Sequence, residues 1–370
     1  MTEQYFISPN VPERLHGPDV LRGFAALGVM ASHVYAISGF PQDPLVGATV
    51  GRFGFLVRLF FAISAFSITY VYSEKIFSQR QLQTFYLKRF FRIAPLFYFM
   101  ILIYLALCLI EGRPFPSWYE ICLSLSFIFP FVPGIHHSIV GGGWSLGLEW
   151  MFYAFFPFLL CLVRGRLSAF IVWGIVCLIA VLRSSYFRHG VIDPILYDYG
   201  ILFFSSHVPF FISGMGSYFV IKRYGANSLK KHSFLLGLAI VFLGVVTIYY
   251  FKCKIDVILP EEIFISVISF LLIVASASGI PGWLDNTFTR YLGLISYSIY
   301  LTHIVVIKLL SRWGIYNWIA ETIGSAFGGF LIASMGTFFA VIVVSHFTYK
   351  FIERPSLRYG KKVISIAKLP

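Results

Sequence analysis

Long runs of apolar residues, separated by short polar connections, dominate the sequence. A helix needs about 20 apolar residues to cross the hydrocarbon core of a bilayer, and most of these runs reach or approach that length. The pattern predicts an all-α, polytopic membrane protein in which residues 1–370 form one membrane domain with no fused soluble domain. About ten transmembrane helices are expected, at residues 20–38, 53–73, 93–111, 147–163, 168–183, 200–221, 233–251, 261–279, 291–310 and 324–348.

Residues 121–132 are also apolar, but this run is short for a membrane span and prolines bracket it. We therefore expect a re-entrant or interfacial segment there. The distribution of Lys and Arg favours the same interpretation, because cytoplasmic loops are enriched in these residues. If the N-terminus is cytoplasmic and this segment does not cross, the C-terminus is cytoplasmic too. The basic clusters then all lie inside, at residues 75–92, 164–166, 222–231 and 350–362.

The composition excludes an ordinary soluble protein. Hydrophobic residues make up 58% of the 370 residues, and charged residues only 12%. The mean hydropathy is +0.81, and no soluble domain needs so much apolar sequence. The net charge of +13 collects between the apolar runs, so it indicates membrane topology and not nucleic-acid binding. The five cysteines show no paired spacing, so neither a disulfide framework nor a metal site is indicated.

The first predicted span carries Arg22 near its start and His33 within its apolar run. On a helix this spacing places His33 about 16 Å further into the membrane, on about the same face. An ionisable side chain inside a span is costly and indicates function by default. A guanidinium at the entrance and a proton acceptor inside suit a reaction in which an anionic carrier docks and its cargo reacts within. The alternatives are a histidine that only bonds a neighbouring helix and an arginine placed by topology.

Five sequence blocks stand out, at residues 21–33, 60–66, 88–95, 144–153 and 292–303. Their order and spacing resemble the integral-membrane acyltransferase-3 family. Members of this family acylate surface polysaccharides, lipids and some small molecules. Two positions depart from the usual pattern, since Ala65 stands where a glycine is usual and Trp150 where a second acid follows Glu149. The resemblance covers nearly the whole chain, and residues 353–355 fit it as well.

The resemblance implies an O-acyltransferase of the bacterial inner membrane. It would move an acetyl or other acyl group from cytoplasmic acyl-CoA, with acetyl-CoA as the usual donor, to a hydroxyl of a cell-surface or lipid-linked saccharide. His33 would act as the general base or would itself carry the acyl group. Arg89 and Arg92, with Arg22, would hold the donor phosphates, because guanidinium groups bind phosphate through forked donors. Topology or lipid headgroup binding is the alternative for these arginines.

The block at residues 144–153 implies further site residues. Glu149 would be a second catalytic residue that orients an imidazole or binds the acceptor, unless it only complements the helix dipole. Trp144 would stack on a sugar ring or anchor the helix at the interface. We expect both at the end of the molecule opposite the basic residues. The other candidates for substrate binding are Ser145, Tyr153 and His303, and the last could instead be a proton relay or a packing residue.

A transporter or flippase for a glycan or acylated substrate is the rival interpretation. Histidines within spans, broken apolar segments and a glycine run also occur in transporters. The two functions differ in chemistry, because only the acyltransferase consumes acyl-CoA or becomes acyl-labelled. The expected partners are acyl-CoA, a saccharide acceptor and membrane lipids, with no nucleic acid and no metal.

Overall fold

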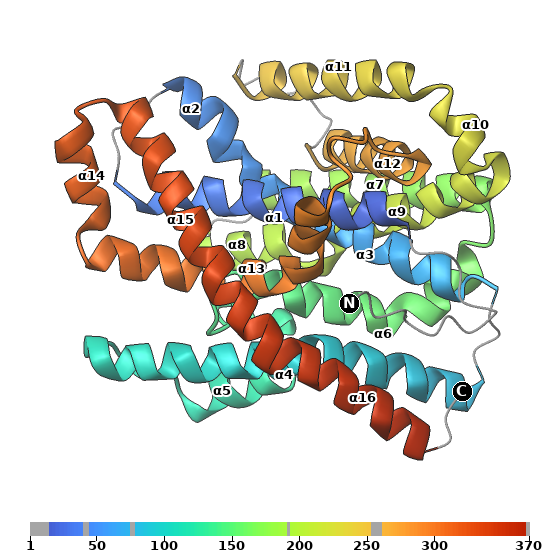
Figure 1. The fold of residues 1–370 in the computed structure, drawn as a ribbon. Helices are drawn as coiled ribbons and strands as arrows, with labels where there is room; N and C mark the ends of the chain where they lie inside the picture. Colours follow the sequence, from blue (N-terminus) through green and yellow to red (C-terminus); the bar gives the residue numbers. More distant parts are fainter. Residues whose placement is uncertain (1–14, 40–43, 75–77, 191–192, 253–260, 368–370) are drawn as a thin grey trace.

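The computed structural model describes residues 15–39, 44–74, 78–190, 193–252 and 261–367. These residues form helices and no strand (Figure 1). Two of the elements are 3₁₀ helices (η1 and η2) and one is a π-helix (η3). In chain order the elements are α1 His16–Ile37, α2 Pro44–Thr49, η1 Val50–Phe55, α3 Leu56–Tyr72, α4 Gln79–Glu111, α5 Trp118–Leu125, η2 Phe129–Phe131, α6 Trp144–Leu162, α7 Arg166–Gly190, α8 Pro194–Leu202, α9 Phe204–Tyr224, α10 Ala226–Lys230, α11 Ser233–Lys252, α12 Glu261–Ser278, α13 Thr287–Arg312, α14 Ile315–Ile323, α15 Ala326–Thr348, η3 Tyr349–Glu353 and α16 Arg354–Ile366.

Most long helices run roughly along one axis, whereas α15 crosses them obliquely and continues through η3 into α16, beside α4 (Figure 1). Among the described residues, eight helical segments are long and apolar enough to cross a membrane. The other two predicted spans are helical as α11 and α12, with apolar stretches at Leu235–Val245 and Glu262–Ser278. The all-α, multi-pass prediction is confirmed, and the count of ten remains a prediction.

The apolar run at residues 121–132 does not form a spanning helix. The helix α5 has 8 residues, which is about 12 Å of rise against a hydrocarbon core of about 30 Å. Phe127 then adopts a left-handed conformation with φ of 59°, and the single turn η2 follows. The run therefore forms no helix long enough to cross, and its re-entrant or interfacial position remains a prediction.

The third predicted span differs in its start, because α4 begins at Gln79 and not near residue 93. The Ser78 hydroxyl accepts the Gln81 N–H, and the Gln81 side chain accepts the Ser78 N–H. This reciprocal cap satisfies two backbone donors that no helical carbonyl can reach. Arg89 and Arg92 consequently lie well inside the helix and not at its mouth.

Pro95 lies in the interior of α4, although it falls near the start of the span predicted at residues 93–111. Because proline has no N–H, the carbonyl of Phe91 loses its helical donor. Ser356 of α16 replaces that donor, with its Oγ donating to the Phe91 carbonyl at 2.8 Å. One turn later Gly360 packs so closely that a Cβ there would lie 2.8 Å from the Phe91 side chain. The proline thus creates the docking point at which α16 attaches to α4.

The helices α1 and α13 run parallel and in close contact. A Cβ on Gly23 would lie 2.9 Å from the Gly293 nitrogen, and a Cβ on Gly293 would lie 2.2 Å from the Asp19 carbonyl oxygen. Ten residues further along each helix, His33 and His303 meet, with ring centroids 5.0 Å apart. The glycine contact therefore sets the separation at which the two histidines face each other.

Substituting Gly293 by alanine is expected to destabilise the fold, because the new methyl group must push α1 away from α13. Overpacking of this kind costs about 1–3 kcal/mol. Thermal unfolding in detergent measures the loss. The matched control is Gly336→Ala in α15, where an added Cβ meets nothing within 4 Å. Equal midpoints for the two variants would show that the helices separate freely at this contact.

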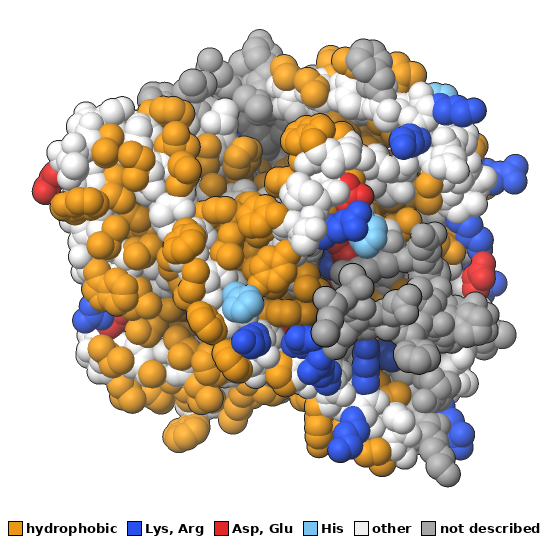
Figure 2. Space-filling model, in the orientation of Figure 1, with side chains coloured by type: hydrophobic (Ala, Val, Ile, Leu, Met, Phe, Trp, Pro, Cys, Tyr) orange, Lys and Arg blue, Asp and Glu red, His pale blue; other side chains and the backbone are white. Residues whose placement is uncertain are grey.

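The surface agrees with a position in the membrane. Figure 2 shows hydrophobic side chains over much of one face, with Lys and Arg gathered around α16. Large apolar side chains are exposed on α15, among them Met335, Phe339 and Phe347. Exposing such an apolar surface to water is unfavourable, whereas contact with lipid chains carries no such penalty.

Candidate active site

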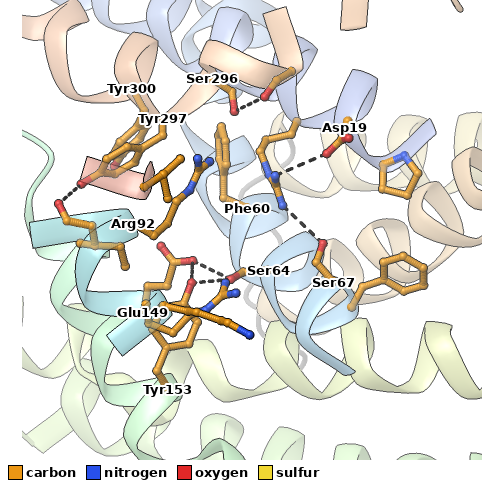
Figure 3. A pocket seen from close by; sticks show the side chains of 18 of the residues that line it. Asp19, Phe60, Ser64, Ser67, Arg92, Glu149, Tyr153, Ser296, Tyr297 and Tyr300 are labelled. Carbon is orange, nitrogen blue, oxygen red and sulfur yellow. Dashed lines mark hydrogen bonds and ion pairs between the residues drawn. The ribbon is translucent and has the colours of Figure 1, made fainter. Parts of the chain in front are cut away.

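A cavity of about 620 Å³ opens among α1, α3, α4, α6, α13 and α16. We call it the arginine cavity, because Arg22, Arg89 and Arg92 all line it, together with Lys88 and Lys361. Figure 3 shows how Glu149 and Arg92 project into it from different helices. The sequence distributes these cations over three helices, and only the fold gathers them in one place.

Two of the three arginines are tied to carboxylates. The Arg22 Nη1 lies 3.6 Å from Asp19 Oδ1, and its Nη2 donates to Ser67 Oγ at 3.4 Å (Figure 3). The Arg92 Nη1 donates to Glu353 Oε1 at 2.5 Å. Glu353 is only 1% exposed and its other oxygen accepts from Ser298 at 2.8 Å. Arg92 therefore neutralises a buried acid at the wall of the cavity.

Arg89 has a buried N–H donor, at Nε, that no residue of the described chain pairs with. Its guanidinium lies over the Tyr153 ring, 5.6 Å from the centroid. A buried donor without a partner is costly unless a ligand or water completes it. Arg89 is the arginine of this cavity best placed to bind an anionic ligand.

Glu149 forms the centre of a hydrogen-bonded group beside Arg89. Its Oε1 accepts from Ser64 at 2.6 Å and also from the Tyr153 hydroxyl, and these two hydroxyls lie 3.0 Å apart (Figure 3). The expectation that Glu149 lies at the far end from the basic residues is wrong. Because α4 starts early, Arg89 and Arg92 reach the level of Glu149 within the bundle.

His33 and His303 form a pair in which the tautomers follow from the carbonyl contacts. Nδ1 of His33 is 2.9 Å from the Val29 carbonyl, and Nδ1 of His303 is 2.6 Å from the Tyr300 carbonyl. A carbonyl only accepts, so both rings carry their proton on Nδ1. Nε2 of His303 then accepts from Nδ1 of His33 at 3.4 Å. This arrangement leaves Nε2 of His33 unprotonated and able to accept a proton.

His303 is 1% exposed and lines neither of the cavities described here. A direct contact between His303 and substrate, as predicted, does not agree with this burial. The geometry instead makes His303 a positioning residue behind the half-buried His33. His33 itself is also absent from the cavity walls. The connection to the arginine cavity runs through Tyr300, whose ring lies 5.6 Å from that of His303 and lines the cavity.

A second cavity of about 370 Å³ contains Trp144 in its wall, and we call it the Trp144 cavity. It is lined by the glycine-rich segment 138–142, α4, α6 and α13. Between the two cavities, the Gly142 carbonyl accepts from Ser145 Oγ and from the Tyr300 hydroxyl, each at 3.0 Å. Ser145 and Tyr300 lie 2.7 Å apart, and both also line the arginine cavity. These three residues form a thin septum between the cavities.

One group in the described chain has the composition of a metal site. Ligand atoms of His136, His137 and Asp198 lie within 4.8 Å of one another. However, Nδ1 of His136 accepts from the Gly134 N–H at 3.2 Å, so its Nε2 carries the proton that it donates to Asp198. Burial and the neighbouring His137 lower the pKa of His136, which favours this neutral form. A metal at Nε2 requires the opposite tautomer, so the group joins the loop to α8 as a hydrogen-bonded clasp.

The sequence matches the family described as "Acyltransferase domain" over residues 15–346. The chain belongs to the acyltransferase-3 family. The acyltransferase is 25% identical to a protein of Acidianus two-tailed virus that is provisionally named an acetyltransferase, over 83% of this chain and 88% of that protein. It is 26% identical to a protein of Bacillus subtilis provisionally named a peptidoglycan O-acetyltransferase, over 94% of this chain and 56% of that protein.

An O-acetyltransferase of Staphylococcus aureus, also named provisionally, is 22% identical over 94% of the acyltransferase and 58% of its own length. The chain thus spans just over half the length of these bacterial relatives. No solved structure matches it. The family and these names support an O-acyltransferase that is a multi-pass membrane protein.

Each of the five blocks that carry the family resemblance contributes residues to the arginine cavity of the acyltransferase. The predicted residues Arg22, Arg89, Arg92, Glu149, Ser145 and Tyr153 line it together. Trp144 lies instead in the other cavity. Sequence reasoning missed Ser64, Tyr300 and Glu353 as partners in the site. All three belong to the segments that carry the resemblance described from the sequence, but only the fold reveals which side chains they contact.

Proposed function

We propose that this acyltransferase moves an acetyl or other acyl group from acyl-CoA to a hydroxyl of a cell-surface or lipid-linked saccharide. The positive-inside rule supports an inner-membrane protein with both termini in the cytoplasm. In that orientation the arginine cavity faces the cytoplasm, where acyl-CoA is made. The observation that carries the proposal is the unpartnered buried Nε of Arg89 within a cavity that contains further cations.

Coenzyme A bears a pyrophosphate and a 3′-phosphate, and forked guanidinium donors suit such groups. Arg89 binds a phosphate, with Lys88 and Lys361 near it on the cavity wall. Arg92, held by Glu353, adds positive charge to that wall. The pantetheine arm then extends along the cavity towards the septum.

The chemical step is attack of the acceptor hydroxyl on the thioester carbonyl. The new C–O bond forms, the C–S bond breaks, and Coenzyme A leaves as the thiolate. His33 lines neither cavity here, so the reacting hydroxyl must come within hydrogen-bond reach of its Nε2 in the substrate complex. There Nε2 takes the hydroxyl proton and returns it to the thiolate, which restores the neutral ring. His303 fixes the tautomer of His33 through Nδ1. Glu149 orients the hydroxyls of Ser64 and Tyr153 in the wall of the arginine cavity.

Acetyl-CoA turnover by the purified protein in nanodiscs tests the donor assignment. We expect the wild type to release free Coenzyme A slowly without acceptor, and Arg89→Gln to raise KM for acetyl-CoA about tenfold or more with a smaller change in kcat. The matched control is Arg80→Gln, an exposed arginine of the same helix. Absence of both acetyl-CoA binding and thioester consumption would overturn the assignment and favour the transporter.

A further inference from the structure

The Trp144 cavity lies at the far ends of the helices that also line the arginine cavity. On α4 the chain runs from Arg92 to Cys108, and on α13 from Tyr297 to Lys308. Arg113 and Lys308 both line the Trp144 cavity. In the proposed orientation this is the outer end, where the positive-inside rule predicts few Lys and Arg. Arg113 is ion-paired with Glu111, so Lys308 is the cation that topology leaves unexplained.

Lys308 is an exposed lysine that forms no ion pair or hydrogen bond with the described residues. Ile304, one turn earlier on α13, packs against the glycine-rich segment, since a Cβ on Gly141 would lie 3.0 Å from it. This contact brings α13 against the cavity wall. The acid in the same wall, Glu120, is held by Ser117, whose N–H and hydroxyl donate to its Oε2 at 2.7 and 2.8 Å, and no ion pair joins it to Lys308 among the described residues.

The remaining wall offers uncharged groups that suit a saccharide. Tyr104 is 5% exposed. Its hydroxyl oxygen lies against the Gly141 N–H, and its O–H proton has no acceptor in the described chain. Trp144 supplies an aromatic surface with a polar N–H. Gly141 and Gly142 let a ligand approach the backbone, because they carry no Cβ. A buried hydroxyl proton without an acceptor points to a ligand that supplies one.

We infer that the Trp144 cavity binds the acceptor and that this acceptor is an anionic saccharide, whose carboxylate or phosphate contacts Lys308. A sugar hydroxyl pairs with Tyr104, and the hydroxyl to be acylated faces the septum at Gly142. The charge is thus a specificity determinant separate from the donor phosphates. This inference rests on the proposed function for the identity of its ligand as an acceptor.

Binding of charged and neutral saccharides of matched size tests the inference, on full-length protein in nanodiscs without acyl-CoA. The probes are trigalacturonate and its methyl ester, and phosphorylated maltotriose and maltotriose. We expect Lys308→Gln to weaken binding of an anionic probe about tenfold, with the neutral probes unchanged. Lys308→Arg keeps most of the affinity. The matched control, Lys350→Gln at an exposed position outside the cavity, binds like the wild type.

The two pairs of probes distinguish a carboxylate from a phosphate, and preference for either one supports the inference. Equal binding of charged and neutral probes, or no loss in Lys308→Gln, overturns it, whatever the protein does with acetyl-CoA. Acetyl-CoA turnover is measured separately. Charge-selective binding with no consumption of acetyl-CoA would keep the anionic saccharide site and refute the proposed function.

Discussion

Replacing His33 by alanine is expected to lower acyl transfer by about 10²–10⁴-fold, because a positioned general base contributes a factor of that size. The expectation rests on the carbonyl contacts, which fix the proton on Nδ1 and leave Nε2 as the acceptor. Transfer of labelled acetyl groups from acetyl-CoA to the acceptor measures the effect. Acetyl-CoA binding should stay close to wild type, since His33 does not line the arginine cavity.

Two further variants separate chemistry from folding. His303→Gln should lower kcat by less than His33→Ala and leave KM for acetyl-CoA unchanged, because it only releases the His33 ring from its position. His232→Ala is the matched control, at an exposed histidine far along the chain from the pair. Retention of more than half of the wild-type rate in a folded His33→Ala protein would remove His33 from the mechanism.

Replacing Arg92 by glutamine is expected to destabilise the protein by about 3–5 kcal/mol, because it leaves a buried carboxylate without its counter-ion. Glu353 is 1% exposed, so water cannot take the place of the guanidinium. The ion pair also joins α4 to η3, because Arg92 and Glu353 are 261 positions apart in the sequence. The midpoint of thermal unfolding in detergent reports the loss.

The control for Arg92 is Arg290→Gln, which breaks the 2.6 Å pair between Arg290 and Asp285. Both side chains of that pair are partly exposed, so its loss should cost about 0–1 kcal/mol. The double variant Arg92→Met/Glu353→Leu should recover most of the stability, since apolar residues can replace a buried pair. If Arg92→Gln is as stable as Arg290→Gln but has a raised KM for acetyl-CoA, Arg92 is a donor ligand and not a structural partner.

The contrast between the two arginines could not be read from the sequence. Arg89 and Arg92 are equivalent members of one short motif, and both were predicted to hold the donor. The fold assigns Glu353 to one and leaves Nε of the other without a partner. The position of Glu149 was wrong for a similar reason, because a span start inferred from apolar length omits the polar first turns of α4. Only the cap at Ser78 shows where that helix begins.

The sequence determined the helical class, the approximate spans, the short segment at residues 121–132 and the family. These follow from apolar length and local residue order, which are properties of neighbouring positions. The tertiary structure alone decided that His33 meets His303, 270 positions away, and that five distant blocks line one cavity. It also placed Trp144 and Lys308 in a separate one. Such contacts depend on helix packing, where single glycines such as Gly293 set the distance between helices, and no local pattern encodes that distance.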